Sequence, residues 1–202
     1  MHEVIQSYLT SLYRNFDNDI KGSMLSSENE IYGELHYYSV VKLLTYLDIS
    51  ENDHFLDLGF GLGKLLFQII LTTTAQHITG IEINNSRFNI VTKLFTTMQN
   101  QLPDCFLNKN ITLLEGDFLQ FNFHPITIVY VCSTVFSFIL LDTISEKINC
   151  MPSVNCVVSF RKLPRLSNFR LTKKLFLHGS WDHAVCYLYS RKKTLTGGHN
   201  DN

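Results

Sequence analysis

The stretch Phe55–Lys64, FLDLGFGLGK, predicts a strand that ends in a glycine-rich turn and continues into a helix. Its hydrophobic run ends at Asp57, and three glycines (Gly59, Gly61 and Gly63) follow at alternate positions before a lysine closes the turn. Glycine has no Cβ, so a ligand can approach the main chain closely and the chain can adopt left-handed dihedral angles. The turn therefore indicates a ligand that is held against the backbone.

Two patterns of nucleotide-binding turns do not fit this stretch. The phosphate-loop pattern G-x-x-x-x-G-K-[ST] fails because Gly59 and Gly63 lie one residue too close and Leu65 stands where a hydroxyl is required. The dinucleotide pattern G-x-G-x-x-G fails because Lys64 holds the position of the third glycine. Asp57 instead offers a carboxylate to an ammonium group. This combination suits a cofactor with an amino-acid end and no phosphate, and S-adenosylmethionine is such a cofactor.

Two further acids support this interpretation. Glu82 ends the next predicted strand in GIEIN, where its carboxylate can accept hydrogen bonds from both hydroxyls of a ribose. Asp117 ends a third strand beside Phe118, in LLEGDFL, and the two side chains together could hold an adenine. Open α/β sheets bind their ligands at the carboxyl ends of the strands. The three acids are therefore expected to meet at one edge of a sheet.

The alternation of strands and helices predicts an α/β fold. We expect an amphipathic helix from Val4 to Phe16, a loop over 17–30, and helices over 37–47, 64–74, 86–102 and 136–150. Near-continuous apolar strands over 54–59, 77–83, 111–117, 126–132 and 155–160 indicate a parallel sheet that is covered on both faces. Two segments within 173–192 follow with no helix between them and predict an antiparallel hairpin. The result is a Rossmann-like, class I methyltransferase fold with a seven-stranded, mostly parallel sheet.

Length and composition limit the class of protein. The 202 residues are 45% hydrophobic and 17% charged, as in an ordinary single globular domain. An odd number of cysteines without a C-x-x-C pair argues against a disulfide framework or a zinc ribbon and predicts a reducing, intracellular compartment. The histidines lack the spacing of metal ligands, so no metal is expected. No signal peptide or membrane-crossing run is found, and we expect no membrane partner.

The net charge of −1 conceals a basic C-terminal segment, residues 161–193. This segment holds nine basic residues and a single acid, Asp182. The cations could form a docking face for an acidic partner, or they could be solvated edges of strands and loops. The sequence leaves both interpretations open.

Seven short motifs, within a matching region that runs from about Tyr13 to Lys193, together resemble a known family. In chain order they are YGEL (Tyr32–Leu35), FLDLGFGLG, GIE, GDFL, VYVCSTVF, VVSFRKLPRLSNFRL and GSWDHAVCYLY. The ordered set is similar to the non-SET histone lysine methyltransferases named for disruption of telomeric silencing, here called Dot-one-like. The resemblance implies a domain that transfers a methyl group from S-adenosylmethionine over 32–193, an N-terminal helix and loop over 1–31 that pack on it, and a polar tail over 194–202.

The resemblance also implies roles for single residues. The residues implied to bind the cofactor are Tyr32, Gly33, Glu34, Asp57, Gly59, Gly61, Gly63, Glu82, Asp117, Phe118 and Cys132. Those implied to act on the substrate are Tyr32, Glu34, Ser133, Phe136, Trp181 and Tyr187, of which the last three would line an aromatic channel for the substrate lysine. A lysine amine has a pKa of about 10.4 in water and must be neutral to attack. An apolar channel lowers that pKa by desolvation.

The chain departs from the family at several of these positions. Cys132 and Ser133 stand where the family has two asparagines, and Lys64 stands where it has a glutamine. Three functions are therefore open. The protein could methylate a protein lysine on a histone or nucleosome, or it could methylate a nucleic acid or small molecule. It could also bind the cofactor without turnover. The expected compartment is the cytoplasm, or the nucleus if the substrate is chromatin.

Overall fold

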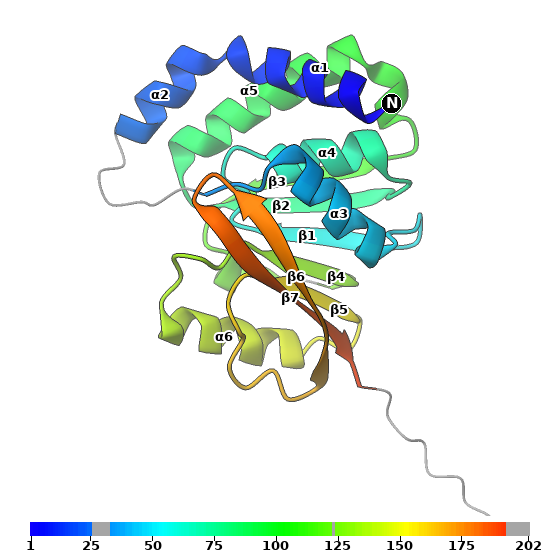
Figure 1. Cartoon of the computed structure of the whole chain (residues 1–202), viewed down its shortest axis with the longest axis vertical. Coiled ribbons are helices and arrows are strands. Elements are labelled where there is room, and N and C mark those ends of the chain that lie inside the picture. Colours follow the sequence, from blue (N-terminus) through cyan, green and yellow to red (C-terminus); the bar gives the residue numbers. More distant parts are fainter. Residues whose placement is uncertain (26–32, 123, 193–202) are drawn as a thin grey trace, which may run out of the picture.

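A computed structural model describes residues 1–25, 33–122 and 124–192, built around one seven-stranded sheet (Figure 1). The strand order is β3-β2-β1-β4-β5-β7-β6. The five parallel strands are β1 (His54–Leu58), β2 (His77–Glu82), β3 (Asn110–Glu115), β4 (Ile128–Val131) and β5 (Cys156–Ser159). The antiparallel strands β6 (Phe169–Gly179) and β7 (Asp182–Arg191) form the hairpin, with β7 next to β5. The predicted fold is confirmed.

Six α-helices are found among the described residues. They are α1 (His2–Arg14), α2 (Asp17–Leu25), α3 (Tyr37–Leu47), α4 (Lys64–Thr72), α5 (Asn85–Gln101) and α6 (Phe138–Asn149), with short 3-10 helices η1 (Pro103–Phe106) and η2 (Phe118–Gln120). Side-chain caps mark the starts of two of the α-helices. Asn84 accepts a hydrogen bond from the Arg87 amide at 3.0 Å, and Ser137 accepts one from the Leu140 amide at 3.2 Å. These helices fall where the sequence predicted them, except α2.

The prediction of a loop over 17–30 is wrong for residues 17–25, which form α2. The polar residues of this segment give little sign of a helix in the sequence. The helix is stabilised by contacts with the rest of the protein. Ile20 packs against the main core, and Asp19 lies 3.7 Å from Lys93 of α5. Figure 1 shows α1 and α2 running along α5. Tertiary contacts of this kind override weak local propensity.

Two hydrophobic cores lie on the two faces of the sheet. The first joins the sheet to α1, α3, α4 and α5, through residues such as Leu12, Leu43 and Phe67. The second joins it to α6, through residues such as Leu141 and Ile144. Between β3 and β4, the described part of 116–127 forms only η2. The second face is therefore covered less completely than predicted.

A polar hollow of about 260 Å³ lies on the second face where that cover is missing. It is lined in part by His54, His77 and Thr112. The imidazoles of His54 and His77 stack with ring centroids 4.0 Å apart. Polar side chains on this part of the sheet allow it to face water.

The loop before α3 is fixed to the turn between β6 and β7. Leu35 forms an isolated antiparallel bridge with Gly179. The Ser180 amide donates to the Glu34 carbonyl at 2.8 Å, and the Glu34 amide donates to the Ser180 hydroxyl at 3.1 Å. Two distant parts of the chain therefore form one wall beside the carboxyl ends of β1 and β4. No helix of the described residues is long and apolar enough to span a membrane.

Candidate functional site

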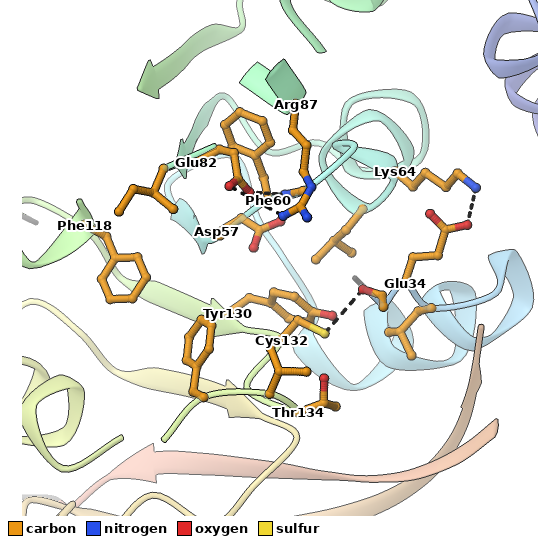
Figure 2. A pocket seen from close by; sticks show the side chains of 18 of the residues that line it. Glu34, Asp57, Phe60, Lys64, Glu82, Arg87, Phe118, Tyr130, Cys132 and Thr134 are labelled. Atoms are coloured by element: carbon orange, nitrogen blue, oxygen red, sulfur yellow. Dashed lines mark hydrogen bonds and ion pairs between the residues drawn. The ribbon is translucent and has the colours of Figure 1, made fainter. Parts of the chain in front are cut away.

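A cavity of about 540 Å³ opens at the carboxyl ends of β1, β2 and β4 (Figure 2). Ten of the predicted site residues line it: Gly33, Glu34, Asp57, Gly59, Gly61, Glu82, Asp117, Phe118, Cys132 and Phe136. They come from five segments that are separated in the sequence. The fold thus brings most of the predicted site together.

The glycine turn between β1 and α4 forms the floor of the cavity. Gly59 and Gly61 have φ angles of +81° and +57°, a region that side chains other than glycine rarely adopt. Gly63 also has a positive φ but does not line the cavity. It precedes α4, and a Cβ there would lie 3.0 Å from Cγ1 of Val91. The first two glycines therefore shape the cavity, whereas Gly63 lets α4 start close to α5.

Asp57 lies at the centre of the cavity wall with an unsatisfied oxygen. Its side chain is 2% exposed, and Oδ1 has no hydrogen-bond partner in the described structure. Burial raises the pKa of this carboxyl well above its usual range, and the charge of Glu82 raises it further. A buried acceptor without a partner costs free energy. Asp57 is therefore prepared to receive a donor from a ligand.

Glu82 has its carboxylate partly satisfied by the protein. Oε2 accepts the Gly61 amide at 2.7 Å, and Oε1 accepts the Asn84 amide at 2.9 Å. Nη1 of Arg87 lies 4.0 Å from Oε1. A carboxylate has about four lone-pair sites, so capacity remains for two further donors. The pair of ribose hydroxyls predicted to bind here fits that capacity.

Two phenylalanines face each other at the far end of the cavity. The rings of Phe118 and Phe136 lie 5.9 Å apart with a 33° tilt, and both line the cavity. Asp117 starts η2, and its Oδ1 accepts the Leu119 amide at 2.9 Å. This end offers aromatic faces beside a carboxylate, as a purine ring with an exocyclic amine requires.

The opposite end of the cavity carries an ion pair between Lys64 and Glu34. Lys64 is the first residue of α4, and its Nζ also lies 5.0 Å from the ring centroid of Tyr13 in α1. The Tyr13 hydroxyl donates to the Leu62 carbonyl at 2.6 Å. Lys64 thus connects the glycine turn, the N-terminal helix and the loop before α3.

Cys132 and Ser133, which follow β4, have different surroundings. Cys132 lines the cavity, and its Sγ donates to the Gly33 carbonyl at 3.7 Å. Burial raises the pKa of its thiol to about 12, so the thiol is protonated at neutral pH. Ser133 is fully buried and does not line the cavity. Its Oγ lies 2.7 Å from Oγ of Ser159 and accepts the Arg161 amide at 2.9 Å, so this hydroxyl is engaged within the fold, and its substrate role stays a prediction.

Two residues of the predicted aromatic channel lie outside the cavity. Trp181 packs edge-on against Phe160 at 5.9 Å and lies directly over Gly33, where an added Cβ would come within 2.4 Å of the indole. Tyr187 lies beside Ser159 in the sheet and packs against the second core. The cavity wall therefore includes Phe136 but neither of these two rings. Tyr32 lies outside the described residues.

Several residues of the cavity wall were not predicted from the sequence. They include Phe60, Ile83, Arg87, Tyr130, Thr134 and Val135. Tyr130 pairs with Asp57 across β4 and β1, and burial raises the pKa of its phenol well above the usual value. In the sequence, the residues on either side of Tyr130 are apolar, so this position resembles one in the hydrophobic core. Arg87 carries a detectable signal, because a cation five residues after a strand-terminal acid lies on the first turn of the next helix.

The described residues contain no group of His, Cys, Asp and Glu side chains that could hold a metal ion.

The sheet order and the cavity at its carboxyl edge define the class of Rossmann-like methyltransferases. An RNA methyltransferase from Salinibacter ruber, solved with S-adenosyl-L-homocysteine, superposes with a TM-score of 0.61 at 16% identity, over 84% of this chain and 99% of that one. A magnesium protoporphyrin IX methyltransferase from Synechocystis, solved with S-adenosylmethionine bound, gives a TM-score of 0.59 at 13% identity, over 77% and 79% of the two chains. The ligands in these structures agree with the predicted cofactor.

The chain belongs to the family described as histone methylation protein DOT1, whose sequence model matches residues 18–175. A curated relative is the histone-lysine N-methyltransferase, H3 lysine-79 specific, of Drosophila melanogaster. It is 26% identical over 152 residues, which cover 72% of this chain and 8% of the fly protein. The chain thus corresponds to a small part of that relative. The predicted family is confirmed.

Proposed function

We propose that this protein uses S-adenosylmethionine to methylate a lysine side chain of a protein, with a histone or nucleosome as the target class. The observation that carries this proposal is the buried, unsatisfied carboxyl of Asp57 above a turn of left-handed glycines. Membership of the DOT1 family supports the transfer of a methyl group to lysine.

The residues of the cavity fit each part of this cofactor. Asp57 would accept from its ammonium group, and Glu82 would use its two remaining lone-pair sites for the ribose hydroxyls. Phe118 would contact the adenine, and Asp117 would accept from the exocyclic amine. Backbone atoms of Gly59 and Gly61 would lie against the centre of the molecule. When bound, the cofactor supplies an electrophilic methyl group.

The protein's part in the transfer is to present a neutral amine in line with that methyl group. Val135, Phe136 and Leu140 give the cavity an apolar side at the exit of β4. A lysine side chain placed there loses solvation of its ammonium form, so its pKa falls toward neutrality. Orientation within a narrow site contributes up to about 7–11 kcal/mol to such a reaction. The protonated thiol of Cys132 is not a nucleophile, which favours direct transfer.

Trp181 takes a different role in this proposal from that expected of a channel residue. Its ring lies against Gly33 and Gly179, where added Cβ atoms would come within 2.4 Å and 2.8 Å. It therefore holds the backbone of the loop before α3 at the cavity wall. We propose Phe136 as the aromatic contact of the acceptor and Trp181 as a positioning residue behind Gly33.

The basic C-terminal segment separates into two groups of cations. Three arginines are engaged within the fold. Arg165 pairs with Asp142 and Glu146, Arg191 donates to carbonyls that include Val154, and Arg161 donates to the Phe136 carbonyl. The other exposed cations of the segment within the described residues are Lys162, Arg170, Lys173, Lys174 and Lys192. We propose that these, and not the whole segment, contact an acidic partner. A chromatin target would place the protein in the nucleus.

A second candidate function is the methylation of a nucleic acid. It is favoured by a surface formed by Lys42 and Tyr46 of α3 with Lys173 and Phe176 of β6. Nζ of Lys173 lies 4.9 Å from the Tyr46 ring, and Nζ of Lys42 donates to the Phe176 carbonyl at 3.2 Å. All four residues are exposed. Cations beside exposed aromatic rings suit the phosphates and bases of a single strand.

A labelling experiment decides between these substrates. The protein is incubated with methyl-labelled cofactor and separate pools of histones, nucleosomes and RNA, and the labelled products are hydrolysed. Methyl-lysine is the expected product. Label on nucleotides would support the second candidate and refute the first. Binding of the cofactor without label in any pool would refute both and indicate a binding protein. The Gly61→Arg variant, which fills the cavity, serves as the control for contaminating activity.

A further inference from the structure

Three large apolar side chains are exposed beside the cavity, in the loop after β4 and the first turn of α6. Val135, Phe138 and Ile139 are exposed by 45%, 65% and 78%. No other five-residue stretch of the described residues exposes three large apolar side chains. Single exposed apolar residues are ordinary, whereas a cluster of them marks a surface that binds something. We call these three residues the apolar rim.

The apolar rim lies where the cavity opens to solvent. Val135 both lines the cavity and is exposed, so the cavity reaches the surface at this residue. Leu140, which follows Ile139 in α6, also lines the cavity. Side chains in a first helical turn tilt back toward the helix start, which here is the end near β4. Phe138 and Ile139 therefore project toward the side from which a substrate approaches. In Figure 2, Thr134, which precedes Val135, lies on the lower side of the cavity.

Hydrogen bonds hold the loop that carries the apolar rim. The Phe136 amide donates to the Ser133 carbonyl at 3.2 Å, and Arg161 donates to the Phe136 carbonyl. Ser137 caps α6 by accepting the Leu140 amide at 3.2 Å. The side chains of the rim cannot turn into either hydrophobic core without breaking these bonds. Their exposure is therefore built into the fold.

The absence of charge in this stretch decides the kind of partner. Residues 126–141 contain no Asp, Glu, Lys, Arg or His. The phosphates of a nucleic acid would need cations at the contact, and so would the carboxylates of an acidic peptide. The exposed cations proposed for an acidic partner belong to the segment after Phe160 and not to the rim. An apolar side chain of a protein is the group that gains from contact with the rim.

We infer that the apolar rim binds an apolar residue of the substrate protein next to the lysine that is methylated, and so selects among lysines. The inference rests on the proposed function. A lysine that reaches Phe136 inside the cavity leaves the neighbouring residues of its chain at the opening. A neighbouring apolar side chain is transferred from water to the rim, whereas a polar one gains nothing there.

Two peptides of equal length and charge test the apolar rim. Each has one central lysine, which is flanked on both sides by leucines in one peptide and by serines in the other. Binding is measured by fluorescence anisotropy, with the protein saturated with S-adenosylhomocysteine. We expect the leucine peptide to bind at least about tenfold more tightly. Phe138→Ser and Ile139→Ser should each reduce this preference by about fivefold. Leu107→Ser, at a residue that is 66% exposed and distant in the sequence, is the matched control and should keep it.

The outcomes separate this inference from the proposed function. Equal binding of the two peptides, or binding of neither, refutes the inference, and so does an equal loss of preference in Leu107→Ser. A dimer of the unaltered protein that Phe138→Ser dissociates would assign the rim to a second copy of this chain and refute it as well. Methyl-lysine formed on both peptides with equal KM refutes the inference alone. Binding that depends on the rim, without methyl-lysine on the leucine peptide, would instead count against the proposed function. Thermal unfolding identifies any variant that has lost its fold.

Discussion

Replacing Asp57 by asparagine tests whether the buried carboxyl of Asp57 loses its proton when the ammonium group of a ligand binds beside it. Burial and the nearby Glu82 raise the pKa of Asp57 in the ligand-free protein, which shifts this carboxyl toward its protonated form. An ammonium group at Oδ1 favours the ionised form, which lowers that pKa. Binding of S-adenosylhomocysteine is therefore expected to release a proton into the buffer.

The magnitude follows from the single carboxyl involved. At most one proton leaves per molecule bound, so the affinity rises by up to about tenfold per pH unit while the pH lies below the raised pKa of Asp57. Calorimetry in two buffers that differ in ionisation enthalpy measures the number of protons directly. Asp57→Asn has no proton to lose, so its binding should be weaker and independent of pH.

Two results would refute this reasoning. One is binding by the unaltered protein with no proton released at any pH from about 4 to about 7, where the ligand's own amine stays charged. The other is an equal release by Asp57→Asn, which would assign the proton to a different group. 5′-Methylthioadenosine, which lacks the ammonium group, provides the matched control and should release none.

Three further predictions concern the cavity and the opposite end of the sheet. Gly61→Arg, at a φ of +57° and with its amide bonded to Glu82, should abolish the binding of S-adenosylhomocysteine measured by calorimetry. Trp181→Ala should lower turnover more than cofactor affinity, because the loop at Gly33 loses its support, and should cost about 2–4 kcal/mol in thermal unfolding. His54 has its pKa lowered by burial and by the stacked His77, so the unfolded chain binds more protons than the folded one. Stability should therefore fall as the pH drops below about 6.5, and less so in His77→Phe; an equal fall in both would show that the imidazole pair is not the cause.

The parts of the fold and site that sequence reasoning predicted are those with local signals. Apolar strands alternating with helical patterns predicted the seven-stranded sheet. The glycine turn and the acids Asp57, Glu82 and Asp117 could be located because each follows directly after a strand. In a parallel sheet, such positions meet at one edge without any knowledge of side-chain packing.

The parts that sequence reasoning missed depend on partners far along the chain. The family resemblance implied a substrate role for Ser133, and the contact of its hydroxyl with Ser159 is not apparent in the sequence. The pairing of Lys64 with Glu34 joins segments that have no common pattern. The helix over 17–25 is stabilised by α5, and its own residues give a weak signal. Contacts of this kind become visible only once the fold is known.

The bond between Ser180 and Glu34 has a consequence for the order in which the protein matures. A growing chain has made every acid of the cavity once Asp117 has been synthesised, yet the wall that carries Glu34 lacks its support until Ser180 follows. These two residues are 146 positions apart, so their contact closes a loop of most of the chain. Long loops close slowly and late in folding. The wall at Glu34 is therefore expected to be completed late in folding, after the sheet that carries the other acids of the cavity.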